Sequence, residues 1–208
     1  MSEEMATRLA GAPGADDGAW EELHGKLLER AEAEALIDLA YERHDSPFGT
    51  LLVVAGDQGI VRIALAAEEE EAVLEDLSRR ISPRIGRHGR RSVTTTRSQL
   101  DRYFTGALTH FDVPLDWRLT RGFRRDVLRE TAMIPYGATA SYAQMAERAG
   151  SPRAVRAAGS ALATNPLPII VPCHRVLRSD GKVGAYLGGT SMKQELLALE
   201  RERRAEAD

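Results

Sequence analysis

SYAQMAERAGSPRAVRAAGSALATNPLPIIVPCHRV, residues 141–176, determines how the second half of the chain is expected to fold. Ser141 and Gln144 have the spacing of a capping box, which opens a short helix. Ser151-Pro152 then supplies a cap and a first-turn proline for a second helix, which should run to about Ala163. Two helices around one tight turn predict a helix-turn-helix.

The second predicted helix carries Arg153 and Arg156, and most of its other side chains are small. Small side chains let another backbone, of protein or nucleic acid, approach closely. Residues 121–178 contain nine arginines and three acidic residues. This balance suits a phosphate backbone. Two packed helices that bind nothing, with a solvated basic face, are the alternative.

Cys173 is the only cysteine of the chain, so no internal disulfide can form. It is either an inert core residue or a nucleophile, and a nucleophilic thiol needs a nearby base or positive charge. His174 is the nearest candidate. Because prolines bracket residues 167–172, we expect an extended segment in which neighbouring side chains point to opposite sides. Contact between thiol and imidazole then requires a tight turn or a bridging water.

Ser191 and Gln194 predict the start of the last helix. Leu196, Leu197 and Glu200 share one face of that helix, which places a carboxylate beside core leucines. A buried carboxylate needs a partner, and an imidazole is a suitable one because the carboxylate fixes its tautomer. The alternative is an exposed Glu200 among other charged residues.

Residues 36–115 predict a small α+β domain. Turn signals separate three strand-like runs, so we expect an antiparallel sheet of Leu36–Tyr41, Thr50–Ala55 and Ile60–Leu65. We expect an amphipathic helix that carries Val73 to Ile81, followed by a basic loop at Arg84–Arg91. Further helices are expected to open at Ser98, ending at Gly106, and at Thr120, ending near Pro135.

The composition is that of one or two globular domains: 208 residues, 43% of them hydrophobic, with a net charge of −3. Residues 1–18 are expected to form a frayed tail, and residues 20–35 a helix. The chain shows neither a membrane-spanning run nor a secretory signal, which favours a cytoplasmic protein. Its five histidines have no zinc-type spacing, so no metal is expected.

Pro172-Cys173-His174-Arg175-Val176 follows Asn165-Pro166 and precedes the run 184–189 and Lys193. Together these residues resemble the O6-alkylguanine-DNA alkyltransferases, the methylated-DNA:protein-cysteine methyltransferases. The resemblance implies an α+β fold: a small ribonuclease-H-like N-terminal domain, with a three-stranded antiparallel sheet and helices, and a mostly helical C-terminal domain with a helix-turn-helix. The expected boundaries are 1–35 for the tail and first helix, 36–115 for the first domain and 119–204 for the DNA-binding and active-site domain.

The resemblance also implies a function in DNA repair. Members of the family flip the damaged guanine out of double-stranded DNA, which they bind through the minor groove, and transfer its alkyl group to the cysteine. Cys173 would be consumed in one displacement that needs no cofactor, so each molecule would act once. A monomer is expected, while cooperative assembly along DNA is left open.

Roles carry over by position. His174 would deprotonate Cys173 through a water, with Glu200 orienting the imidazole, and Tyr142 would donate a hydrogen bond to the leaving guanine. Arg156 would fill the gap in the base stack, and Asn165 would tie the helix-turn-helix to the active-site segment. The remaining DNA contacts expected are Arg124, Ser151, Ser179, Ala157 and Gly159, and the remaining pocket residues are Val176, Tyr186, Leu187 and Gly188.

This chain departs from some members of the family. Leu187 occupies a position where some carry a small polar residue, which leaves pocket width open, and the zinc site near the start of some relatives has no counterpart. Two other hypotheses remain. An alkyltransferase-like module would bind the lesion without transfer, although such modules lack the cysteine that this chain retains. A cysteine hydrolase would use Cys173 and His174 for many turnovers without DNA.

Overall fold

A computed structural model of the chain describes residues 23, 25–27, 30–31, 34 and 36–207. The chain divides into two compact units, residues 1–37 and 38–208. The predicted tail, residues 1–18, lies outside the described residues, as does part of the predicted helix 20–35. The described positions 23, 25–27 and 30–31 are helical, in agreement with that helix.

The first half of the larger unit contains a four-stranded sheet of order β3-β2-β1-β4. The three expected strands are present and antiparallel: β1 (Leu39–Ser46), β2 (Gly49–Gly56) and β3 (Gly59–Ala64). β1 and β2 are joined by a tight turn in which Ser46 pairs with Gly49, whose φ of 90° suits a glycine.

The fourth strand, β4 (Ile85–Arg87), pairs in parallel with the start of β1. It lies in the stretch expected to be a basic loop. Three residues with one aliphatic side chain give no strand pattern of their own, so the neighbouring edge of β1 determines this conformation. Arg84, just before β4, pairs with Asp38 at 2.7 Å and holds the two segments together.

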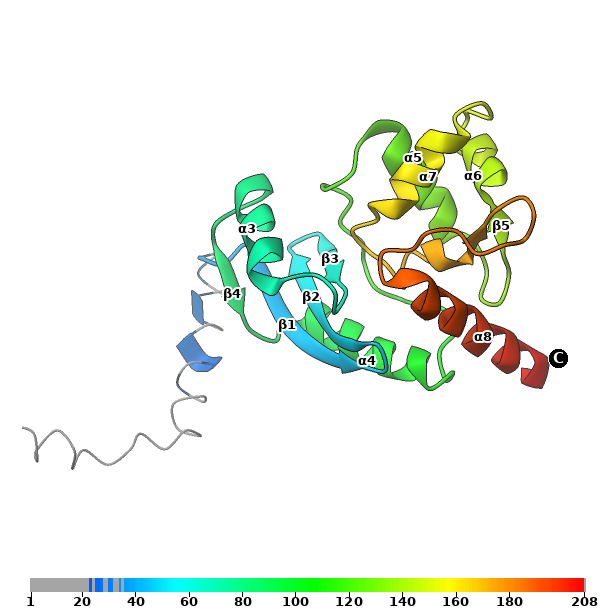
Figure 1. Cartoon of the computed structure of the whole chain (residues 1–208). Coiled ribbons are helices and arrows are strands. Elements are labelled where there is room, and N and C mark those ends of the chain that lie inside the picture. The colour runs from blue at the N-terminus through cyan, green and yellow to red at the C-terminus, as the bar shows by residue number, and fades with distance from the viewer. Residues whose placement is uncertain (1–22, 24, 28–29, 32–33, 35, 208) are drawn as a thin grey trace, which may run out of the picture. The chain divides into compact units, whose positions relative to one another are not determined.

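Two helices cover opposite faces of the sheet (Figure 1). β2 shows why: Leu51 and Val53 belong to the core that includes α4 (Arg91–Phe104), whereas Leu52 and Val54 pack with α3 (Glu70–Arg80). α4 begins well before Ser98, where the sequence predicted a start. Its buried face includes Val93 and Thr96, and the intervening serine and threonines hide that period in the sequence.

The second half is mostly helical, as expected. Its elements are α5 (Gly122–Ala132), α6 (Tyr142–Arg148), α7 (Val155–Ala163), the 3₁₀ turn η1 (Cys173–Arg175), α8 (Gly189–Ala207), and a two-stranded ribbon of β5 (Ala140–Ser141) and β6 (Val176–Leu177). The capping box of Ser141 and Gln144 is present at the start of α6.

Three predicted helix starts are wrong. Thr120 does not cap α5, because its hydroxyl donates to the Trp117 carbonyl instead. Ser151 does not cap α7: the Ala154 amide donates to the Ser151 carbonyl, which closes a separate turn before the helix begins. α8 starts at Gly189, two residues before Ser191.

The proline-bracketed segment before Cys173 is turned rather than extended. The amide of Ile170 donates to the carbonyl of Pro168 and the amide of Val171 to that of Leu167. Ile169, fully buried, has a φ of 73°. A β-branched residue rarely adopts this left-handed conformation, which costs about 1–3 kcal/mol, so the surrounding core must hold the turn in place.

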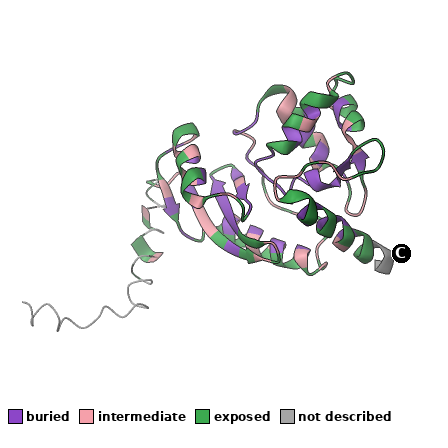
Figure 2. Cartoon of the chain, in the orientation of Figure 1, coloured by how far each residue is buried: buried purple, intermediate pink, exposed green. Residues whose placement is uncertain are grey.

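Buried residues follow the strands and the inner faces of the helices (Figure 2). One continuous core joins the α4 face of the sheet to α5, α6, α7 and α8. None of the helices in the described part of the chain has the length and apolar character needed to cross a membrane.

Candidate active site at Cys173

Cys173 begins the 3₁₀ turn η1 and is almost completely buried, with 4% of its surface exposed. Burial raises the pKa of its thiol, because a thiolate loses hydration in the core. A hydrogen bond from Asn165 and the positive charge of Lys193 act in the opposite direction. The thiol is therefore protonated at rest, and its surroundings contain groups that stabilise the thiolate once a base removes the proton.

Asn165 connects the end of α7 to the cysteine segment with three hydrogen bonds. Its Nδ2 donates to the Val171 carbonyl at 2.8 Å and to the Cys173 sulfur at 3.2 Å, and its Oδ1 accepts from the Leu167 amide at 3.0 Å. The side chain is 1% exposed. The contacts that the family resemblance implies for Asn165 are present, while its role in the reaction stays a prediction.

His174 and Glu200 form a buried pair. Nε2 of His174 lies 2.9 Å from Oε1 of Glu200, and neither residue is exposed to solvent. Burial lowers the pKa of His174, although the adjacent carboxylate opposes this effect. The other ring nitrogen, Nδ1, is also buried and has no hydrogen-bond partner among the described residues.

Arg175 completes the ionic centre, a role that the sequence did not predict. Its Nε and Nη2 both lie 2.9 Å from Glu200 oxygens, and its Nη1 donates to the Ile134 carbonyl at 2.5 Å. The Gly137 amide also donates to Glu200, at 3.0 Å. Burial raises the pKa of Glu200, but the bonds from His174 and Arg175 outweigh it and bring the pKa to about 2. Glu200 is therefore ionised at physiological pH.

Tyr103 of α4 also reaches this centre. Its hydroxyl donates to Oε1 of Glu200 at 2.7 Å and lies 3.3 Å from Nε2 of His174. No local pattern could reveal the contact, because 97 residues separate Tyr103 from Glu200.

These contacts assign the proton of the neutral imidazole. Ionised Glu200 can only accept hydrogen bonds, and Tyr103 gives its single proton to Glu200. Both neighbours of Nε2 are therefore acceptors, so Nε2 carries the hydrogen of His174. Nδ1 then holds the lone pair and is the basic atom. No hydrogen bond joins His174 to Cys173 among the described residues, so the structure does not show a direct thiol–imidazole pair.

A second buried cation, Lys193 of α8, lies near the thiol. Its ammonium group donates to the Val176 carbonyl at 2.6 Å and lies 5.9 Å from the centre of the Tyr142 ring. From the sequence alone, Lys193 was named only as one of the residues that carry the family resemblance and was given no role. Tyr142, at the start of α6, packs against Gly184, where an added Cβ would come within 2.5 Å of the phenol oxygen. The glycine therefore leaves room for the Tyr142 hydroxyl.

The loop before α8 forms another side of the site. The ring of Tyr186 meets that of His174 edge to face, with centroids 6.3 Å apart, and its hydroxyl is buried without a partner among the described residues. A Cβ at Gly188 would overlap the Met192 sulfur, so a larger residue here would have to displace the Met192 side chain. Leu187 is half-buried and packs on the core.

Most of the residues predicted to contact DNA lie at the surface. Ser151, Arg156, Ala157 and Ser179 are exposed, and Gly159 is half-buried beside the Tyr142 ring. Residues 150–154 line a hollow at the turn between α6 and α7. Arg124 differs from expectation, because its Nη2 donates to the Thr164 carbonyl and ties α5 to the end of α7.

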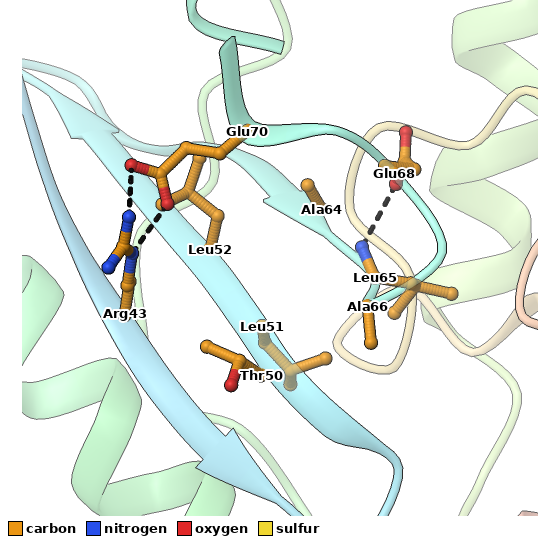
Figure 3. Close-up of a pocket in the computed structure, with 9 residues that line it drawn as sticks. All are labelled: Arg43, Thr50, Leu51, Leu52, Ala64, Leu65, Ala66, Glu68 and Glu70. Atoms are coloured by element: carbon orange, nitrogen blue, oxygen red, sulfur yellow. Dashed lines mark hydrogen bonds and ion pairs between the residues drawn. The ribbon is translucent and has the colours of Figure 1, made fainter. Parts of the chain in front are cut away.

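Another pocket lies on the sheet and contains none of the predicted site residues (Figure 3). Its charged side chains already have partners: Arg43 pairs with Glu70 at 2.6 Å, and Glu68 accepts from the Leu65 amide at 2.9 Å. Among the described residues, no cluster of three or more histidine, cysteine or acidic side chains could hold a metal.

Comparison with known proteins agrees with this arrangement. Residues 39–117 match the family model of the 6-O-methylguanine DNA methyltransferase ribonuclease-like domain, and residues 122–202 match that of its DNA binding domain. A methylated-DNA–protein-cysteine methyltransferase of Mycolicibacterium paratuberculosis is 40% identical over 78% of this chain and 93% of its own length. A constitutive one from Bacillus subtilis is 33% identical over 77% and 94%.

Solved structures give the same result. An O6-methylguanine methyltransferase of Mycobacterium tuberculosis superposes with a TM-score of 0.66 and 35% identity, covering 79% of this chain and 94% of that one. The OGT of the same bacterium in complex with DNA superposes with a TM-score of 0.66 and 36% identity, over the same shares. Sequence, site geometry and fold therefore agree: this chain is a member of the 6-O-methylguanine DNA methyltransferase family.

Proposed function

We propose that this protein repairs DNA by transferring the alkyl group of O6-alkylguanine to Cys173, once per molecule. The observation that carries the proposal is a buried thiol, bonded to Asn165, next to an imidazole whose basic Nδ1 is free of partners among the described residues. A thiol in this setting is inert until the imidazole accepts its proton.

The reaction is one displacement at carbon. A water passes the Cys173 proton to Nδ1 of His174, whose charge Glu200 stabilises across 2.9 Å. The thiolate attacks the alkyl carbon, the carbon–O6 bond breaks, and its electron pair remains on the guanine, which receives a hydrogen bond from Tyr142. A thioether is a poor leaving group, and no step returns the thiol. No cofactor takes part.

The lesion has to leave the duplex to reach a buried sulfur. Arg156 would occupy the vacated gap, and the small residues Ala157 and Gly159 suit the narrow minor groove. Ser151 and Ser179 would bind phosphates, and Arg124 would do so after changing its contact with Thr164. These contacts carry no base specificity. Because part of the affinity comes from arginines close to phosphates, the affinity for DNA should weaken as the salt concentration rises.

The flipped base would lie against the loop before α8. Tyr186, Leu187 and Gly188 would form one wall of its pocket, Val176 another, and Asn165 would hold the cysteine segment in place. Leu187 makes this wall more apolar than a small polar residue would.

We extend the proposal to the organisation of the protein. Residues 36–115 would form the sheet domain and residues 119–204 the DNA-binding and active-site domain, with residues 1–35 outside both. The protein would act as a monomer in the cytoplasm on double-stranded DNA.

An intact-mass measurement after incubation with a duplex that contains O6-methylguanine tests the function. Each molecule should exchange one hydrogen for one methyl group, once, at Cys173. Cys173→Ala should bind the duplex without gaining mass. Binding without a mass gain in the unmodified protein would favour a lesion-binding module, and repeated turnover on an ester would favour a hydrolase.

A further inference from the structure

We infer that Tyr103, from the sheet domain, is a positioning residue of the alkyl-transfer reaction, which lowers the basicity of His174 through Glu200 and supports its Nε2–H tautomer. The inference rests on the proposed function. It concerns a residue outside the half of the chain that holds the cysteine, the histidine and the glutamate.

The contacts of Tyr103 support this role. The side chain is completely buried, and burial together with Glu200 raises its pKa well above 10.0, so the hydroxyl keeps its proton. That proton goes to Oε1 of Glu200 at 2.7 Å. The same oxygen accepts from Nε2 of His174 at 2.9 Å, so phenol and imidazole compete for one atom.

Two effects on His174 follow. The phenol oxygen, 3.3 Å from Nε2, gives that nitrogen a second acceptor and disfavours the tautomer with the hydrogen on Nδ1. The phenol proton also withdraws charge from Oε1, which reduces the attraction of Glu200 for an imidazolium. Tyr103 thus keeps Nδ1 unprotonated and ready to accept the thiol proton.

The position of the phenol is fixed from the sheet side of the core. Its ring packs against Phe104, Phe111 and Tyr136, with centroids 5.2 to 6.1 Å away. The other titratable or charged groups near His174 come from η1, the loop before α8 and α8 itself; they are Cys173, Arg175, Tyr186, Lys193 and Glu200. Tyr103 is the residue that α4 adds to these groups around His174.

The test compares Tyr103→Phe with Tyr136→Phe in the full chain. Tyr136 lies beside Tyr103, and its buried hydroxyl has no hydrogen-bond partner among the described residues, so its removal controls for loss of a phenol oxygen from the same cluster. The rate of methyl transfer from an O6-methylguanine duplex is measured in a single turnover across pH, and ¹⁵N NMR reports the tautomer and the protonation of His174.

Tyr103→Phe should react roughly 10-fold more slowly at neutral pH, as expected for loss of a hydrogen bond to a charged group. The acid limb of its pH profile should move to higher pH, because unshielded Glu200 stabilises the imidazolium. Its NMR spectrum should show more imidazolium at a given pH, while the neutral ring keeps its hydrogen on Nε2, because ionised Glu200 still accepts from that atom. Tyr136→Phe should match the unmodified protein in all three measurements.

Replacement of Tyr103 by 3-fluorotyrosine keeps the hydroxyl and its packing but makes it a stronger donor, so the acid limb should move to lower pH. This second variant decides the matter if Tyr103→Phe folds poorly. An unchanged pH profile and an unchanged protonation of His174 in the folded variants would overturn the inference. If the unmodified protein gains no methyl group, the proposed function itself fails, which is a different result.

Discussion

The amide of Asn165 donates a hydrogen bond of 3.2 Å to the sulfur of Cys173. The same amide nitrogen holds the Val171 carbonyl at 2.8 Å, so one side chain both shapes the turn before the cysteine and supports the developing thiolate. Structure and reactivity therefore depend on the same group.

Asn165→Asp should separate these two roles. The aspartate can still accept from the Leu167 amide, but it cannot donate to the sulfur, and its charge disfavours a thiolate. We expect the pKa of Cys173 to rise further and methyl transfer at neutral pH to slow at least roughly 10-fold. Ultraviolet titration of the thiolate and single-turnover rates measure both. Unchanged thiolate titration would contradict the role assigned to this hydrogen bond.

Lys193→Met should slow the reaction in a different way. The methionine keeps the length of the buried chain but removes the charge that favours the Cys173 thiolate. We expect the pKa of Cys173 to increase and the rate at neutral pH to fall, with partial recovery at higher pH. Lys182→Met, at an exposed position, is the control and should behave like the unmodified protein. Equal rates for both variants at every pH would exclude an electrostatic role for Lys193.

Arg156→Ala should affect duplex DNA selectively. Without the side chain that we propose fills the base stack, repair of an O6-methylguanine duplex should slow at least roughly 10-fold, because unstacking a base costs a few kcal/mol. Reaction with free O6-benzylguanine should be unchanged. Arg153→Ala, in the turn before α7, is the matched control and should lose little. Equal slowing on duplex and free base would remove the proposed role of Arg156.

Stability should decline on both sides of neutral pH. Folding lowers the pKa of His174. Its contribution to the free energy of unfolding is therefore complete above pH 6.5 and is lost as the pH falls from 6.5 to the pKa of the folded state. Glu200 adds a second loss, as the pH falls from 4.5 towards about 2. The pKa of Cys173 is raised, so its contribution is present below 9.0 and is lost above it. Thermal unfolding across pH measures all three.

Glu200→Gln tests the part of the stability that is lost at acidic pH. It leaves Arg175 buried without its carboxylate, which should lower the free energy of unfolding by about 3–5 kcal/mol near neutral pH. Its stability should then vary less than that of the unmodified protein between pH 4.5 and 2. Glu195→Gln, on the exposed side of the same helix, should change neither quantity.

The methylated product should be less stable than the starting protein. Cys173 lies in a packed site with 4% exposure, and an extra methyl group in a packed core costs about 1–3 kcal/mol. For a domain of this size the melting temperature should fall by roughly 2–12 °C. Calorimetry before and after reaction with an O6-methylguanine duplex measures it. An unchanged melting temperature would mean that the site already has room for the alkyl group.

Local signals predicted much of the fold. The capping box of Ser141 and Gln144 and the leucines beside Glu200 depend on side chains a few residues apart, and the structure contains both features. The predicted helix start at Thr120 is wrong because a threonine hydroxyl can also close a turn, and the local sequence does not distinguish the two uses. The predicted start at Ser151 is wrong because the backbone forms a separate turn there, between the Ser151 carbonyl and the Ala154 amide.

The parts of the site that sequence could not supply depend on distant contacts. Tyr103 and Glu200 are joined only by the packing of α4 against α8 and η1, and β4 exists because β1 offers it an edge. Arg175 was visible in the motif, but its paired contact with Glu200 requires the turn at η1. Periodicity and capping rules describe single elements and carry no information about which elements meet.

Because Cys173 is almost completely enclosed, its alkylation should leave a lasting change in the stability of the protein. If the predicted loss of stability is observed, a used copy has the same chain as a fresh one but a folded state that is easier to open. Cellular proteases that act on loosened proteins could therefore remove spent copies and leave fresh ones, with no dedicated mark or receptor.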